Sequence, residues 1–174
     1  IAFRIAEQSY FLPRFVQAIV GAAICVLIYF LGRTAFPESV ARGAGVGAAL
    51  YGPLIYFGGE LLPTIVAIFL SLLSLHFLLR PACPNPWNLL IVGFLLGLAA
   101  LAVVNMLVLL PLYLLWLYKG YPRSGRGLFV LLGCGLAIFP VTVRNYIVGH
   151  GQALISANTG FEFYLGNNAD YART

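Results

Sequence analysis

Long stretches without charge constrain this chain more than any other feature of its sequence. A helix needs roughly 20 apolar residues to cross ~30 Å of hydrocarbon, and several runs approach that length. Hydrophobic residues fill 61% of the 174 positions, charged residues fill 9%, and the mean hydropathy is +0.96. Soluble domains average nearer ~45–50% apolar and ~25% charged residues. The sequence therefore predicts an integral membrane protein, and it excludes a soluble enzyme or a nucleic-acid-binding protein despite a net charge of +5.

The breaks between the apolar runs predict the fold class. Charged and glycine-rich segments end most runs, and the proline-rich turn 81–86 blocks helix continuation. The run 87–118 is too long for one crossing, so we divide it near Asn105. We expect an all-α, polytopic transmembrane bundle of about six spans, followed by a polar external tail, 144–174. The expected spans are 15–32, 43–57, 61–79, 87–103, 105–118 and 127–143.

Basic residues are distributed unequally between the two sets of connectors. When the spans alternate in direction, one side receives six basic residues against the single acid Glu38, and the other side is balanced. The six are Arg33, Arg42, Arg80, Lys119, Arg123 and Arg126. Because cytoplasmic loops are enriched in Lys and Arg, this set predicts the cytoplasmic side. The turn at Glu60, the Asn105 junction and the tail are then external.

Glu60 is the only acid among the predicted spans, and it lies at the external edge after two glycines. An acid at a membrane edge costs energy unless something pairs with it. One interpretation is a solvated carboxylate that begins a helix and is stabilised by the helix dipole. The other is a metal ligand or a contact to a polar substrate, and a carboxylate suits Mg²⁺ or Mn²⁺. We expect no organic cofactor.

A second group of candidate residues follows the last span. Arg144, Asn145 and Tyr146 come directly after a proline-containing segment, and the planar fork of an arginine suits a phosphate or pyrophosphate. Arginine and tyrosine also serve as interfacial anchors, so that alternative stays open. Asn167 and Asn168 lie among aromatic residues of the tail. They either hold a sugar or form turns.

Small residues and the remaining reactive side chains predict packing rather than chemistry. The segment 43–47 and the pair Gly93 and Gly97 are typical of close helix contacts in membranes. His76 has no second ligand at a metal-binding spacing, so we expect a buried, hydrogen-bonded imidazole. The three cysteines are widely separated, and we expect neither disulfides nor zinc.

Five segments together resemble the family 39 glycosyltransferases of the GT-C membrane class. They are Pro-Val-Thr-Val-Arg-Asn-Tyr (140–146), 155–168, 29–33, 51–62 and Gly-Leu-Ala-Ala-Leu (97–101). This family includes the protein O-mannosyltransferases and the bacterial aminoarabinose lipid A transferases. It moves a sugar from a polyprenyl-phosphate carrier to an acceptor on the non-cytoplasmic face.

The resemblance implies roles for individual residues. Glu60 falls where the family has the acid of its second external loop, near the metal and the carrier phosphate. Arg144 matches the arginine of the Pro-x-x-x-Arg-Asn motif, and the implied role is to face that phosphate. Two features depart from the family. Val103-Val104-Asn105 replaces Arg-Pro-Asn, and the family's catalytic aspartate belongs to a loop upstream of residue 1. We therefore expect a fragment of a larger GT-C domain that is inactive alone.

The resemblance also implies a location and partners. We expect a bacterial inner (plasma) membrane protein with its polar tail in the periplasm. Its partners would be membrane lipids, a polyprenyl-phosphate-linked sugar and an acceptor that the sequence does not identify. The alternative is a membrane transporter or lipid flippase. Such proteins usually place ionisable groups at the bilayer midplane and contain internal repeats, and here only His76 is a midplane candidate.

Overall fold

The computed structural model describes residues 11–60, 62–80, 85–121 and 125–149, and this part of the chain is helical without strands. The expected all-α fold is thus confirmed. The elements are α2 (Phe11–Ala35), α3 (Glu38–Ala49), α4 (Gly52–Gly59), α5 (Thr64–Leu78), α6 (Pro86–Ala102), the 3-10 helix η1 (Val104–Val108), α7 (Leu109–Gly120) and α8 (Arg126–Gly149).

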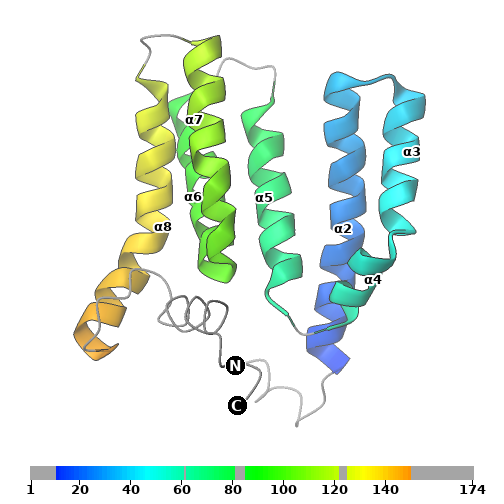
Figure 1. Ribbon diagram of the computed structural model, residues 1–174, viewed down its shortest axis with the longest axis horizontal. Coiled ribbons are helices and arrows are strands. Elements are labelled where there is room, and N and C mark those ends of the chain that lie inside the picture. Colours follow the sequence, from blue (N-terminus) through cyan, green and yellow to red (C-terminus); the bar gives the residue numbers. More distant parts are fainter. Residues whose placement is uncertain (1–10, 61, 81–84, 122–124, 150–174) are drawn as a thin grey trace, which may run out of the picture.

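The long helices lie side by side, with α2 and α3 on one side of the array, α6, α7 and α8 on the other, and α5 between them (Figure 1). We call the end where α2, α5 and α7 terminate and α3, α6 and α8 begin the basic end. Its described basic residues are Arg33, Arg42, Arg80, Lys119 and Arg126. The described acid at this end, Glu38, pairs with Arg42 at 2.7 Å. The unequal charge found in the sequence therefore gathers at one end of the fold.

Two described helices are each long and apolar enough to cross a membrane, Phe11–Ala35 and Arg126–Val148. The pair α4 and α5 passes the same test only together, with a bend of 119° between them. The expected number of six spans is therefore not confirmed. The expected span 43–57 is interrupted, because Tyr51 is extended (φ −73°, ψ 107°) and α4 starts again with a proline in its first turn, where proline is favourable.

The last helix extends further than the sequence indicated. We expected a span ending near Val143, but α8 continues to Gly149 and carries Arg144, Asn145 and Tyr146. Pro140 lies inside α8 and has no N–H to donate to the preceding turn. Membrane helices tolerate such a proline because neighbouring groups satisfy the freed carbonyl. These three candidate residues are therefore helical, not part of an irregular tail.

The tightest packing joins α6 to α8. A Cβ on Gly97 would lie 2.7 Å from the Cβ of Ala137, and one on Gly93 would overlap the backbone carbonyl of Val130. On α8, a Cβ on Gly133 would overlap the carbonyl of Leu90. Glycines on both helices therefore let the backbones approach closely, as the Gly93 and Gly97 pair predicted.

The packing of α3 on α2 uses only part of the predicted small-residue segment. Ala41 is fully buried against Gly32, and a Cβ on Gly45 would lie 3.2 Å from the Cβ of Tyr29. Gly43 and Gly47 have open space beside them. This side of the molecule is consequently less closely filled.

His76 differs from its expected state. Its ring lies beside the rings of Phe30 and Phe77, with centroids 6.2 Å away in both cases. Its Nδ1 is buried without a hydrogen-bond partner among the described residues. The hydrogen bond expected for this imidazole is therefore not found there, and aromatic contacts surround the ring instead.

Candidate functional site

A cavity of about 540 Å³ lies between α2, α3 and α4, toward the end of the molecule opposite the basic end. Small residues form much of its wall: Ala18, Gly21 and Ala22 from α2, Ala48 and Ala49 from α3, and Gly58 and Gly59 from α4. Arg14 from the first turn of α2 is its charged lining residue. Short side chains leave the space open, so the cavity offers an apolar wall with one guanidinium.

Glu60 follows the two glycines that line this cavity. It is exposed and ends α4 in an extended conformation (φ −84°, ψ 142°), with its N–H donating to the carbonyl of Tyr56 at 3.2 Å. Helix α5 begins only at Thr64. Glu60 thus lies at the carboxyl end of α4, where the helix dipole disfavours a negative charge. The interpretation of Glu60 as a helix-start carboxylate does not fit this position.

The charge of Glu60 has no protein partner among the described residues. The ion pair found in this part of the chain joins Arg42 to Glu38 at the basic end. A solvated carboxylate without a cation is free to bind a ligand that brings positive charge or hydrogen-bond donors. This availability is what distinguishes Glu60 from Glu38.

Gln17 fixes the segment that follows Glu60. Its Nε2 donates to the carbonyl oxygen of Leu62 at 2.9 Å, which ties α2 to the connection between α4 and α5. Its Oε1 is buried without a partner in the described residues. Sequence reasoning assigned no role to Gln17 or Arg14. The signal for Gln17 was present, since it is a lone amide in an otherwise apolar run.

The described residues contain no group of three or more His, Cys, Asp or Glu side chains that could hold a metal ion. An all-protein metal cage therefore does not fit this part of the chain. Magnesium, however, commonly binds one or two carboxylates and completes its shell with water and substrate phosphate. Glu60 fits that donor set as the protein's carboxylate.

Arg144 lies at the same end of the molecule as Glu60 but on the other side of the array. Helices α5 and α6 stand between α4 and the carboxyl-terminal part of α8 (Figure 1). Arg144 and Tyr146 are exposed, and Asn145 is half-buried. Successive helical residues point about 100° apart, so these three side chains do not converge on one group. Asn167 and Asn168 lie outside the described residues.

The comparison with known families decides which class of protein this is. A family model for dolichyl-phosphate-mannose-protein mannosyltransferases matches residues 1–144. The chain belongs to this family. No curated protein and no solved structure matches it. Family membership confirms the resemblance to GT-C glycosyltransferases, and it implies a membrane glycosyltransferase with a polyprenyl-phosphate-linked sugar as donor.

The match includes the cavity, Glu60 and Arg144, and it ends before Asn145. The other candidate residues, Asn145, Tyr146, Asn167 and Asn168, lie beyond the matched region. The match places the first group inside the region that the chain shares with the family, and it assigns no role to any single residue.

Proposed function

We propose that the chain belongs to the membrane part of an enzyme that transfers a sugar from a polyprenyl-phosphate carrier to an acceptor at the end of the molecule that holds Glu60. This end is the non-cytoplasmic face, and the membrane is a bacterial inner (plasma) membrane. The basic end supports this orientation, because Lys and Arg are retained on the cytoplasmic side.

The observation that carries the proposal is the pairing of an apolar cavity with an uncompensated carboxylate. A polyprenyl phosphate has a long apolar chain and a charged head. The small residues of α2 and α3 suit the first prenyl units, and Arg14 lines the same cavity. Glu60 lies directly after the cavity-lining glycines, where the phosphate would meet water. The apolar wall thus suits the prenyl chain, and the guanidinium of Arg14 suits the phosphate. Glu60, which is an anion like the phosphate, would complement it only through a bound divalent cation.

In such a transfer, the nucleophilic atom of the acceptor loses its proton to a general base and forms a bond to the anomeric carbon of the sugar. The bond from that carbon to the phosphate oxygen breaks, and the polyprenyl phosphate leaves with the electron pair. Positive charge near the leaving phosphate stabilises the transition state. Mg²⁺ or Mn²⁺ held by Glu60 would neutralise the negative charge that develops on the leaving phosphate. Among the described basic residues of this end, Arg14 lines the cavity, and we assign it to the phosphate. Arg144 lies across the array from this cavity (Figure 1), so its assignment to the phosphate rests only on the resemblance to the arginine of the family's Pro-x-x-x-Arg-Asn motif. Asn145, Tyr146, Asn167 and Asn168 remain candidates for contacting the substrate.

Replacing one carboxylate by its amide tests the proposal. In the natural enzyme, we expect Glu60→Gln to lower turnover at least tenfold and to weaken the dependence on Mg²⁺ or Mn²⁺, because the amide keeps the shape and loses the charge. The measurement is transfer of radiolabelled sugar from a polyprenyl phosphate in liposomes, across a series of metal concentrations.

Glu38→Gln is the matched control. Glu38 is a surface residue in an (i, i+4) pair with Arg42, and such pairs contribute only about 0.3–0.5 kcal/mol. This variant should keep its activity and its metal dependence. If both variants behave alike, Glu60 has no special role and the proposed site is wrong.

A further inference from the structure

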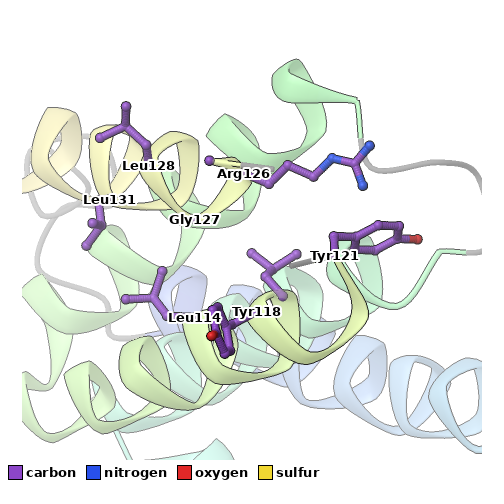
Figure 2. A pocket seen from close by; sticks show the side chains of 9 residues that line it. Leu114, Tyr118, Tyr121, Arg126, Gly127, Leu128 and Leu131 are labelled. Atoms are coloured by element: carbon purple, nitrogen blue, oxygen red, sulfur yellow. The ribbon is translucent and has the colours of Figure 1, made fainter. Parts of the chain in front are cut away.

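A second pocket of about 480 Å³ lies at the basic end, between the last turns of α7 and the first turns of α8. Figure 2 shows its two halves. The side chains of Leu114 and Leu131 point toward one another in an apolar half, at whose edge Leu128 lies, and those of Arg126 and Tyr121 lie together at the other half. The pocket therefore combines an apolar cleft with a positively charged entrance, and it lies at the opposite end of the helices from Glu60.

Two glycines shape this pocket where α8 begins. Gly125 has a positive φ of 62°, a conformation that glycine adopts without strain. Gly127 lies on the first turn of α8, and a Cβ there would be 2.9 Å from Cδ2 of Leu114. A side chain at Gly125 would strain the turn before α8, and one at Gly127 would require the end of the Leu114 side chain to move. Both glycines, together with Leu114, line the pocket.

The guanidinium of Arg126 is held in place but not neutralised. Its Cζ lies 4.2 Å from the centroid of the Tyr121 ring, and Arg126 makes no ion pair with a described acid. A guanidinium stacked on an aromatic face keeps its in-plane N–H donors available. Arg126 therefore presents an ordered fork suited to a phosphate.

The charge of this end selects the sign of the ligand. Glu38 is the described acid at this end, and its charge is paired with that of Arg42. The remaining described charges there are all positive, and they attract an anion. A free phosphate would make no use of the leucine walls, whereas an acyl chain would pack against them through close van der Waals contact. Basic pockets between membrane helices on the cytoplasmic side bind anionic lipid head groups.

We propose that the α7–α8 pocket binds one anionic phospholipid, with an acyl chain along Leu114, Leu128 and Leu131 and its phosphate on Arg126. This site is separate from sugar transfer. It does not depend on the assignments of Glu60 or Arg144.

Native mass spectrometry of the enzyme in detergent tests this site. Equal amounts of dioleoyl phosphatidylglycerol and dioleoyl phosphatidylcholine are added, and the retained lipids are counted. We expect one phosphatidylglycerol to be held in preference. Arg126→Gln should weaken that retention about tenfold or more, the fold-change for losing a hydrogen bond to a charged group.

Arg33→Gln is the matched control, because Arg33 lies at the same end and also approaches a tyrosine, with its Cζ 5.7 Å from the Tyr29 ring centroid. It lies outside the pocket, so retention should stay within about twofold. Leu131→Trp should fill the cleft, because Leu131 points toward Leu114 across it (Figure 2), and should weaken retention as strongly as Arg126→Gln. Since Leu131 is 44% exposed, that variant gives the answer even if Arg126→Gln does not fold.

Three results would overturn the site. The first is equal retention of the two lipids by the unmodified enzyme. The second is an equal loss in Arg126→Gln and Arg33→Gln, which would indicate diffuse attraction to a basic surface. The third is displacement of the lipid by millimolar inorganic phosphate, which would show that the pocket recognises the anion alone.

Discussion

The α2–α3–α4 side and the α5–α6–α8 side of the molecule are built from similarly apolar helices, yet they pack differently. Helix α6 has seven buried residues, whereas α3 has one and α4 has none among the residues described. In a membrane, an apolar side chain gains little free energy by moving from lipid into a helix interface, so helix association depends on close van der Waals packing. Composition alone therefore does not decide which side becomes closely packed.

The position of the glycines explains much of this difference. Gly93, Gly97 and Gly133 each face a backbone or Cβ atom of the partner helix within 3 Å of where a Cβ would be. Gly21 and Gly47 face open space. The same residue type thus closes one interface and leaves a cavity beside the other. The candidate carrier site lies on the loosely packed side, as expected for regions that must accept a ligand.

The largest predicted effect is a loss of transfer activity on changing Arg144, and it tests whether α8 contributes to binding the polyprenyl-phosphate carrier. Arg144→Lys keeps the charge, and lysine still reaches the interface, so an anchoring residue would tolerate the change. A residue that grips a phosphate through two parallel N–H bonds should not. Losing one charge-assisted bond costs roughly 1.5–3 kcal/mol. We expect a loss of about one to two orders of magnitude in turnover or carrier affinity.

The control for Arg144 is Arg33→Lys at the basic end, which should leave transfer unchanged. Both variants should insert and express normally. Full activity of Arg144→Lys across carrier concentrations would reduce Arg144 to an anchor and confine the site to the α2–α3–α4 side.

A pair of glycine substitutions on α8 tests the tight interface. Gly133→Ala places a methyl group against the carbonyl of Leu90, whereas Gly135→Ala enters open space two residues away. Overpacking costs about 1–3 kcal/mol, so we expect Gly133→Ala to lower the free energy of unfolding by that amount. Gly135→Ala should be neutral or slightly stabilising, because alanine favours helix. Reversible unfolding in mixed detergent micelles measures both, and equal values would disprove the described α6–α8 contact.

The sequence predicted the general fold because that fold follows from composition and from strong helix-breaking signals. The absence of charge established the membrane class, and the turn 81–86 separated α5 from α6 as expected. The break at Leu50 and Tyr51 was missed because the run 43–57 contains no charge. The extension of α8 was missed because a proline, which ends helices in water, is tolerated inside membrane helices.

Some residues of the candidate site could be predicted from the local sequence, and others depend on how distant helices pack. Glu60 stood out because an acid is costly among apolar spans. Arg14 did not stand out, since its importance depends on a cavity formed by three helices that are not fixed by any local pattern. The grouping of Arg144 with Asn145 and Tyr146 assumed an irregular segment. A helix instead spreads the three side chains around its axis.

Hydrogen bonding between helices gives a smaller effect on the tightly packed side. The buried Oγ of Ser74 donates to the carbonyl of Val92 on α6 at 2.8 Å, whereas Ser71 donates to Ala67 on its own helix. Interhelical bonds in membranes average about 0.6 kcal/mol and reach about 1.7 kcal/mol. We expect Ser74→Ala to destabilise the protein within that range and Ser71→Ala to have less effect, in the same unfolding assay. A larger effect at Ser71 would contradict the assignment of Ser74 as the link between α5 and α6.

The smallest predicted change in stability is at Gln17, which links α2 to the segment after Glu60. The bond from Nε2 to Leu62 is exposed, and its loss should cost less than about 1 kcal/mol. Gln17→Leu also removes the buried, unpartnered Oε1, which offsets part of that cost. Unfolding should therefore barely change. The α4–α5 connection, however, loses its tie to α2, so backbone amide exchange near Glu60 and Leu62 should become faster.

Gln17→Glu is the matched comparison, because its carboxylate has no N–H to donate to the Leu62 carbonyl. If exchange near Glu60 stays unchanged in both variants, Gln17 does not position this segment, and Glu60 is held by the turn of α4 itself.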